Sequence, residues 1–174
     1  MRRSGLVSAG RKKERGKGMP ERLTVSERLG AIDLIADYAY TLESGDIDGY
    51  VDNFTPDGTL EFRSGRHQGR DAIRALVSHL YAIGQDGPGG NRHILGLPHV
   101  AATPDGCAAH TYVMIVSGEK GDRPPAASFG QYADLMTRSG GRWRFASRRL
   151  IPVPAPAGNS NGGTAIPRPP FPHS

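Results

Sequence analysis

The chain has 174 residues, a length typical of one domain, and a formal net charge of +5. Residues 1–20 carry seven Lys/Arg and one Glu, which leaves 15 Lys/Arg and 16 Asp/Glu, a net −1, for the remainder. The charge therefore does not indicate a basic nucleic-acid-binding domain. No aromatic residue interleaves the charges of residues 1–20, so we interpret them as a disordered basic arm, or as an extension upstream of a chain that starts at Met19.

No segment approaches the ~20 apolar residues of a membrane span, so no membrane partner is expected. The apolar stretch of the arm, GLVSAG, is shorter than the ~7–15 residues of a signal-peptide core. Cys107 is the one cysteine, so no internal disulfide can form and a cytoplasmic location is expected. Residues 154–174 are rich in Pro and Gly and are interpreted as a disordered tail. The folded domain is predicted to cover residues 21–153.

The first predicted helix begins after Thr24 and ends near Ser44. Thr24 and Glu27 have the form of a capping box, and Gly45 is a typical helix terminator. Apolar residues at spacings of three and four predict one buried face, and Glu43 falls on that face. The apolar members of the predicted face are Val25, Leu29, Ile32, Ala36 and Ala39.

Two further helices are expected before the sheet. A short one covers residues 46–54, and a turn at 55–58 then leads into a strand at 59–62. A third helix over residues 69–84 has a regular apolar face, formed by Ile73, Leu76, Val77 and Leu80.

After residue 90 the chain has the pattern of four β-strands separated by turn sequences. Helices that precede an antiparallel sheet indicate an α+β fold. We predict a curved antiparallel sheet wrapped around the helices, a cone-shaped α+β barrel with an internal cavity for a small ligand. The four predicted strands are 93–102, 107–118, 128–138 and 142–153.

Glu43 and His93 are the leading candidate catalytic residues. A carboxylate on an apolar helical face is either solvated at a frayed helix end or buried, and burial would raise its pKa and make it a general base. His93 shares a strand face with Leu95 and Leu97. It is either a core histidine with a backbone partner or an acid/base group paired with Glu43.

Arg149 is the candidate for binding an anionic oxygen. Strict alternation in RWRFASRRL places Arg149 on the face of the aromatic residues and Arg148 on the opposite face. Arg149 would anchor a carboxylate or enolate oxygen, or else form a salt bridge with Asp134. The other predicted site residues are Tyr38, the alternative phenols Tyr112 and Tyr132, and the ring side chains Phe54 and Phe62.

Sequence motifs for other chemistries do not occur. The histidines lack metal-ligand spacing, and the glycine-rich stretch at 84–90 leads into a strand without a P-loop lysine. There is no GxSxG elbow. We therefore expect no metal and no cofactor.

Residues 22–152 resemble the SnoaL-like domains of the nuclear transport factor 2-like superfamily. The resemblance is carried by IADYAYTLESGDIDGYVDNFTPDGTLEF, GRDAIRALV, RHILG and GQYADLMTRSGGRWRFASRRL. It implies the α+β cone, and members often dimerise through the sheet. The superfamily includes polyketide cyclases, scytalone and bile-acid dehydratases, ketosteroid isomerases and proteins without known activity, so the fold does not define the function.

The resemblance also assigns roles to individual positions. Glu43 stands where the dehydratases have an aspartate at the end of the first helix, and Tyr38 matches a tyrosine five residues before it. His93 matches the first-strand histidine, and Arg149 lies near a functional arginine. The second histidine of scytalone dehydratase would fall near Val116, which cannot titrate.

We expect a cofactor-independent lyase or isomerase, of dehydratase, isomerase or cyclase type, that acts on a small apolar oxygenated molecule such as a polyketide or steroid. His93 and Glu43 would move a proton, while Tyr38 and Arg149 would stabilise an oxyanion. The alternative is a non-catalytic small-molecule-binding or assembly module of the same fold. In that case Glu43 would point to solvent and His93 would bond to the backbone.

Overall fold

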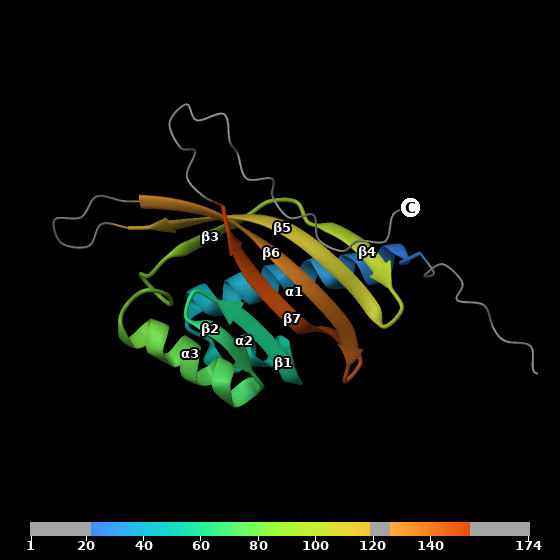
Figure 1. Ribbon diagram of the computed structural model, residues 1–174, viewed down its shortest axis with the longest axis horizontal. Helices are drawn as coiled ribbons and strands as arrows, with labels where there is room; N and C mark the ends of the chain where they lie inside the picture. The colour runs from blue at the N-terminus through green and yellow to red at the C-terminus, as the bar shows by residue number, and fades with distance from the viewer. Residues whose placement is uncertain (1–21, 119–125, 154–174) are drawn as a thin grey trace, which may run out of the picture.

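The computed structural model describes residues 22–118 and 126–153. The predicted basic arm (1–20) and the predicted tail (154–174) lie outside these ranges. Within them, three helices pack against one curved seven-stranded sheet, which is open rather than closed into a barrel (Figure 1). The helices are α1 (Val25–Ser44), α2 (Ile47–Asp52) and α3 (Arg70–Ala82). The strands are β1 (Phe54–Phe62), β2 (Gly65–Gln68), β3 (Arg92–Leu95), β4 (His99–Thr103), β5 (Gly106–Ser117), β6 (Ala126–Ser139) and β7 (Arg142–Pro152).

The strand order is β2-β1-β7-β6-β5-β3, and β4 also pairs with β5. The sheet curves over α1, and α2 and α3 lie beside β1 and β2 (Figure 1). The predicted α+β fold with a curved sheet is confirmed, with one refinement to the pairing. β1 runs parallel to β7, so the sheet is mixed rather than wholly antiparallel.

Helix α1 begins and ends as predicted, but its buried face is not the predicted one. The backbone N–H of Glu27 donates to Thr24 Oγ1 at 3.2 Å, the Glu27 carboxylate accepts from the Thr24 N–H, and Gly45 ends the helix with a φ of 86°. Val25 and Leu29 are 76% and 53% exposed. Of the predicted face only Ala39 is buried, and Ile32 packs against the core partly buried. The other buried side chains of the helix are Ala31, Leu34, Ile35, Tyr38, Thr41 and Leu42.

Two predicted strand boundaries are also wrong. Residues 55–58, expected to be a turn, form an irregular stretch inside β1, where the pairing with β7 changes register. The strand predicted over 93–102 is two strands, β3 and β4, with Pro98 between them. Proline has no N–H to donate to a sheet ladder, and Leu97 before it is exposed rather than sharing the inner face of His93.

The hydrophobic core lies between α1 and the concave face of the sheet. Its centre is filled by aromatic rings from α1, α2, β1, β6 and β7, which pack edge-to-face or tilted at centroid distances of 4.8–6.2 Å. Cys107 is buried at this layer, and burial raises the pKa of its thiol to about 12, so it is an inert core residue. Among the described residues, the helices are too short or too polar to cross a membrane.

Candidate functional site

A one-residue bulge in β7 determines which arginine faces the interior. Leu135 of β6 pairs with Ser147, whereas Met136 pairs with Phe145, so Ala146 is the extra residue on β7. The bulge reverses the alternation beyond it, because a shift of one residue moves every later side chain to the other face.

Arg148 is therefore buried and Arg149 is exposed. The prediction that Arg149 lines the interior is wrong, and Arg148 takes the inward position. The salt bridge with Asp134 that was considered for Arg149 is formed by Arg148 instead.

Arg148 and Asp134 form a salt bridge in which both side chains are 0% exposed. Arg148 Nε donates to Asp134 Oδ1 and Nη2 donates to Oδ2, each at 2.8 Å, which is the bidentate geometry of a strong charged pair. Burial disfavours the guanidinium charge, but the carboxylate beside it outweighs burial and raises the pKa of Arg148. The guanidinium is thus charged at any ordinary pH.

Three aromatic rings surround this guanidinium. Its central carbon lies 4.0 Å from the ring centroid of Tyr38, 4.2 Å from that of Tyr132 and 4.1 Å from that of Phe145. These contacts stabilise a desolvated cation. Arg148 Nη1 is buried and has no hydrogen-bond partner among the described residues. Arg148 therefore places a fixed positive charge in the interior, and its Nη1 is a donor nitrogen without a partner among the described residues.

The phenols beside Arg148 are neutral hydrogen-bonding groups. Tyr50 Oη donates to Tyr38 Oη at 2.9 Å, and Tyr132 packs edge-to-face on Tyr38. Burial raises the pKa of all three phenols above the usual value of about 10. The structure thus brings the predicted residues Tyr38 and Tyr132 together and adds Tyr50, while Phe54 packs against the rings of Tyr38 and Tyr50.

The other two predicted aromatic residues lie elsewhere. Tyr112 is 54% exposed on the outer face of β5, because its neighbour Thr111 takes the inward position. The prediction of Tyr112 as an interior phenol is therefore wrong. Phe62 is partly buried at the end of β1 and lines a cavity at the mouth of the fold.

Glu43 and His93 meet, but not as a hydrogen-bonded dyad. Glu43 Oε1 accepts from the backbone N–H of His93 at 2.5 Å and lies 3.5 Å from His93 Nδ1, beyond the 2.6–3.2 Å or so expected of a side-chain hydrogen bond. Glu43 Oε2 is 3.9 Å from Arg92 Nε. The carboxylate therefore links the end of α1 to the start of β3 by a hydrogen bond and places a negative charge beside the imidazole.

His93 is positioned as a neutral base. Its side chain is 6% exposed, and burial lowers the pKa of the imidazole, against the opposing charges of Asp86 and Glu43. Arg148 also acts electrostatically to lower this pKa. The imidazole is thus uncharged at neutral pH, and Nδ1 has no hydrogen-bond partner among the described residues.

The sequence prediction missed several charged and polar residues of this site. Asp86 is buried in the glycine-rich loop after α3, where a polar residue carries no distinctive signal. Asp134 did carry a signal, because it alternates with Tyr132 and Met136 on an otherwise apolar strand face. Among the described residues, no group of three or more His, Cys, Asp or Glu side chains could hold a metal ion.

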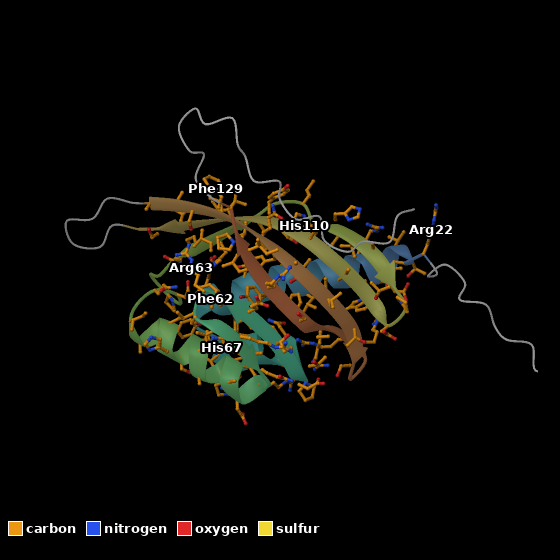
Figure 2. All side chains as sticks on the ribbon, in the orientation of Figure 1. Arg22, Phe62, Arg63, His67, His110 and Phe129 are labelled. Atoms are coloured by element: carbon orange, nitrogen blue, oxygen red, sulfur yellow. The ribbon has the colours of Figure 1, made fainter. Side chains whose placement is uncertain are left out.

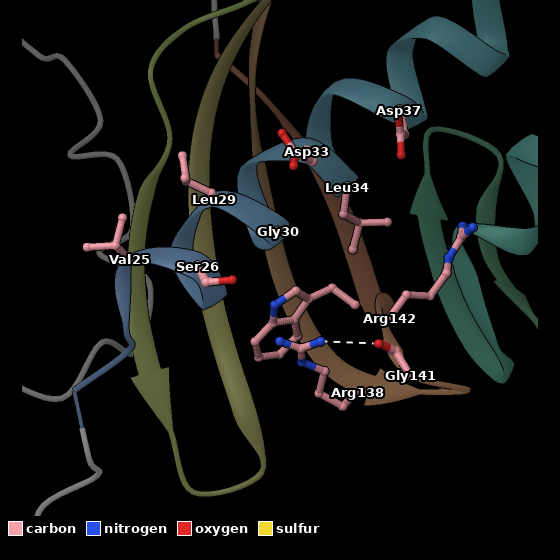
Figure 3. Close-up of a pocket in the computed structure, with 11 residues that line it drawn as sticks. Val25, Ser26, Leu29, Gly30, Asp33, Leu34, Asp37, Arg138, Gly141 and Arg142 are labelled. Atoms are coloured by element: carbon pink, nitrogen blue, oxygen red, sulfur yellow. Dashed lines mark hydrogen bonds between the residues drawn. The ribbon is translucent and has the colours of Figure 1, made fainter.

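A groove of about 700 Å³ lies away from this cluster, between α1 and the β6–β7 hairpin (Figure 3). Arg138 stacks over the ring of Trp143 at 4.9 Å and donates to the Gly141 carbonyl at 3.2 Å. Asp33 and Asp37 line the helical wall. None of the predicted site residues lines this groove, so its size does not make it the candidate centre.

Comparisons with solved structures identify relatives of the same fold. A single-residue variant of the Mycobacterium tuberculosis protein Rv3472, described as of unknown function, is 24% identical with a TM-score of 0.65, over 73% of this chain and 72% of that chain. A Novosphingobium aromaticivorans protein, provisionally assigned as a scytalone dehydratase, is 18% identical with a TM-score of 0.67, over 83% and 95%. ActVI-ORFA from Streptomyces coelicolor is 18% identical with a TM-score of 0.62, over 72% and 96%.

At these identities the likeness shows the fold alone. A search of curated proteins finds no match. The model of the SnoaL-like domain matches residues 24–149, which contain the whole cluster around Arg148 and His93. The chain therefore belongs to the SnoaL-like domain family.

Proposed function

We propose that the protein is a cofactor-independent acid/base enzyme of dehydratase, isomerase or cyclase type. Its substrate would be a small apolar oxygenated molecule such as a polyketide or steroid. The family and its scytalone dehydratase-like neighbour support an enzyme of this kind. The observation that carries the proposal is a neutral, buried His93 beside two carboxylates, within electrostatic range of the buried cation Arg148.

In the proposed reaction His93 accepts a proton from the carbon next to a substrate carbonyl. The resulting imidazolium is stabilised by the negative charges of Glu43 and Asp86, and the proton is later returned to the product or to the leaving hydroxyl. The electron pair moves onto the carbonyl oxygen. Arg148, through its free Nη1 donor, and the neutral phenol of Tyr38 would stabilise that oxyanion.

The substrate would enter through a cavity of about 490 Å³, which we name the mouth cavity. It is bounded by α3, the β1–β2 turn, the end of β5, the start of β6 and Leu150 of β7. Its lining residue Ile115 is paired with His93 across β5 and β3. Leu150, also in the lining, lies two residues beyond Arg148 on the same strand. Neither His93 nor Arg148 lines the mouth cavity itself, but each lies close to one of its lining residues along the sheet.

Two observations favour a second candidate, a non-catalytic small-molecule-binding or assembly module. Glu43 bonds to the backbone N–H of His93 rather than to its imidazole, an arrangement that also serves a purely structural role. The aromatic rings around Arg148 are closely packed, as in a core.

The test is substitution of the proposed base. His93→Gln should lower turnover by about 10²–10⁴-fold, because a positioned acid/base group contributes that much. Candidate hydroxylated ketones are screened by mass spectrometry for loss of water and by NMR for isomerisation. His99→Gln, at an exposed position on β4, is the matched control and should retain activity. Equal turnover of His93→Gln and the unmodified protein would reject His93 as the base, whereas ligand binding without turnover by the unmodified protein would favour the binding module.

We further propose a homodimer formed through the outer face of the sheet. Three large apolar side chains are exposed there: Tyr112, Phe129 and Leu135. Exposed apolar patches are typical of interaction sites. The single cysteine, buried and unpaired, supports a reducing, cytoplasmic location.

A further inference from the structure

The mouth cavity has an apolar wall, and an arginine belongs to its lining. Its wall includes Phe62, Leu80, Ile115 and Leu150. Among the described residues that line it there is no aspartate or glutamate, whereas Arg63 and His79 both contribute to the rim. Because a carboxylate would be needed to neutralise an amine, this lining favours an anion over a cation.

Arg63 is available to a ligand. It is exposed in the turn between β1 and β2, next to Phe62 (Figure 2), and it lines the mouth cavity. It makes no hydrogen bond or ion pair with any residue in the described part of the chain. Two arginines of α3 differ: Arg70 and Arg74 pair with Asp52 and Asp48 at 2.8 and 2.7 Å.

We propose that the mouth cavity binds an amphiphilic anion. The apolar body of this ligand lies against Phe62, Leu80, Ile115 and Leu150, and Arg63 binds its carboxylate, sulfonate or phosphate group. A guanidinium presents parallel N–H donors that match the geometry of these oxyanions. The inference rests on the proposed function, because it defines the substrate class of the same site as an acidic rather than a neutral or basic apolar molecule.

The experiment compares two fluorescent probes that share one ring system. 8-Anilinonaphthalene-1-sulfonate carries a sulfonate, and N-phenyl-1-naphthylamine does not. Arg63→Gln should weaken binding of the sulfonate probe about threefold to tenfold and leave the neutral probe unchanged, with a smaller difference at high salt. Arg66→Gln, an exposed arginine of β2 outside the cavity lining, is the matched control and should alter neither titration.

A second variant locates the probes. Ser128 lines the mouth cavity and pairs with Ile115 across β6 and β5, so Ser128→Trp should fill the cavity and block both probes. Unchanged binding by Ser128→Trp, or equal weakening of both probes by Arg63→Gln, would overturn the inference.

Failure of the inference is distinguishable from failure of the proposed function. His93→Gln should leave both probe affinities intact while it removes turnover. Selective loss of the sulfonate probe in Arg63→Gln, together with an absence of turnover in the unmodified protein, would reject the enzyme proposal and leave the anion site standing. Full turnover by His93→Gln would reject His93 as the base.

Discussion

His93 links the proposed chemistry to the stability of the protein. Burial places the pKa of the folded imidazole below the ordinary value of 6.5. Above that value both folded and unfolded states are neutral at this position. As pH falls through it, the unfolded state binds the proton first, so this group lowers the free energy of unfolding.

We therefore expect the melting temperature to fall between about pH 7 and pH 5, and to fall less steeply in His93→Gln. Thermal unfolding followed by circular dichroism over this range provides the measurement. A steeper decrease in His93→Gln than in the unmodified protein would mean that Glu43 and Asp86 stabilise the folded imidazolium more than burial opposes it.

The pair of Arg148 and Asp134 gives a second prediction at the scale of single residues. Arg148→Met removes the cation and leaves the Asp134 carboxylate buried without its partner, which should cost about 3–5 kcal/mol in the free energy of unfolding. The double variant Arg148→Met with Asp134→Leu should recover much of this loss, because an apolar pair can replace a buried ion pair. Urea unfolding of both variants tests this, and a double variant less stable than Arg148→Met would contradict it.

Asp52 joins three elements of the fold. From the end of α2 it accepts hydrogen bonds from Arg70 of α3 at 2.8 Å and Arg144 of β7 at 3.1 and 3.2 Å, and Arg142 lies within 3.3 Å. Burial raises the pKa of Asp52, but the hydrogen bond and charge of Arg144, with the charges of Arg142 and Arg70, outweigh it and lower the pKa below 3.8. The carboxylate thus stabilises the fold above that pH, and the contribution is lost as pH falls through the lowered pKa.

Asp52→Asn should lower the free energy of unfolding at neutral pH by about 1–2 kcal/mol, a value reduced for the partial solvent exposure of the group. The matched control is Asp48→Asn. It removes the ion pair with the exposed Arg74, and the loss of this surface pair should change stability little. Urea unfolding at neutral pH measures both. Equal effects of the two substitutions would show that the three-arginine arrangement adds nothing to a surface ion pair.

The helices and long strands were predictable because their signals are local. The capping box of α1, the apolar face of α3 and the turns around β5–β7 all lie in short stretches of sequence. The buried face of α1 was not predictable in this way. This helix has apolar residues on two sides, and the side that is buried is determined by contacts with the sheet, where Tyr38 packs on Tyr132 and Phe145.

The candidate site was predictable in part, for a related reason. Glu43 and His93 were chosen from the faces of their predicted elements, and Tyr38 from the family resemblance. The choice of Arg148 over Arg149 depends instead on pairing with β6. A bulge is a property of two strands together, so alternation within one strand cannot locate it.

At the scale of the whole molecule, the outer face of the sheet determines the expected assembly. Phe129→Asp should convert the proposed dimer to a monomer, because it places a charge in an apolar interface. Tyr40→Asp, at a 72% exposed position on α1, is the control and should leave the oligomeric state unchanged. Light scattering after size-exclusion chromatography gives the mass of each variant. A monomeric parent protein, or a dimeric Phe129→Asp, would reject this interface.

The extra residue Ala146 also affects how this chain is aligned with its relatives. In a homologue whose last strand lacks the extra residue, the side chain that occupies the space of Arg148 is aligned one column away from it. An alignment by sequence alone would then place the buried arginine in two neighbouring columns and make both look variable. Superposition of coordinates, with a gap placed at Ala146, restores a single column and is the proper basis for tracing this residue through the family.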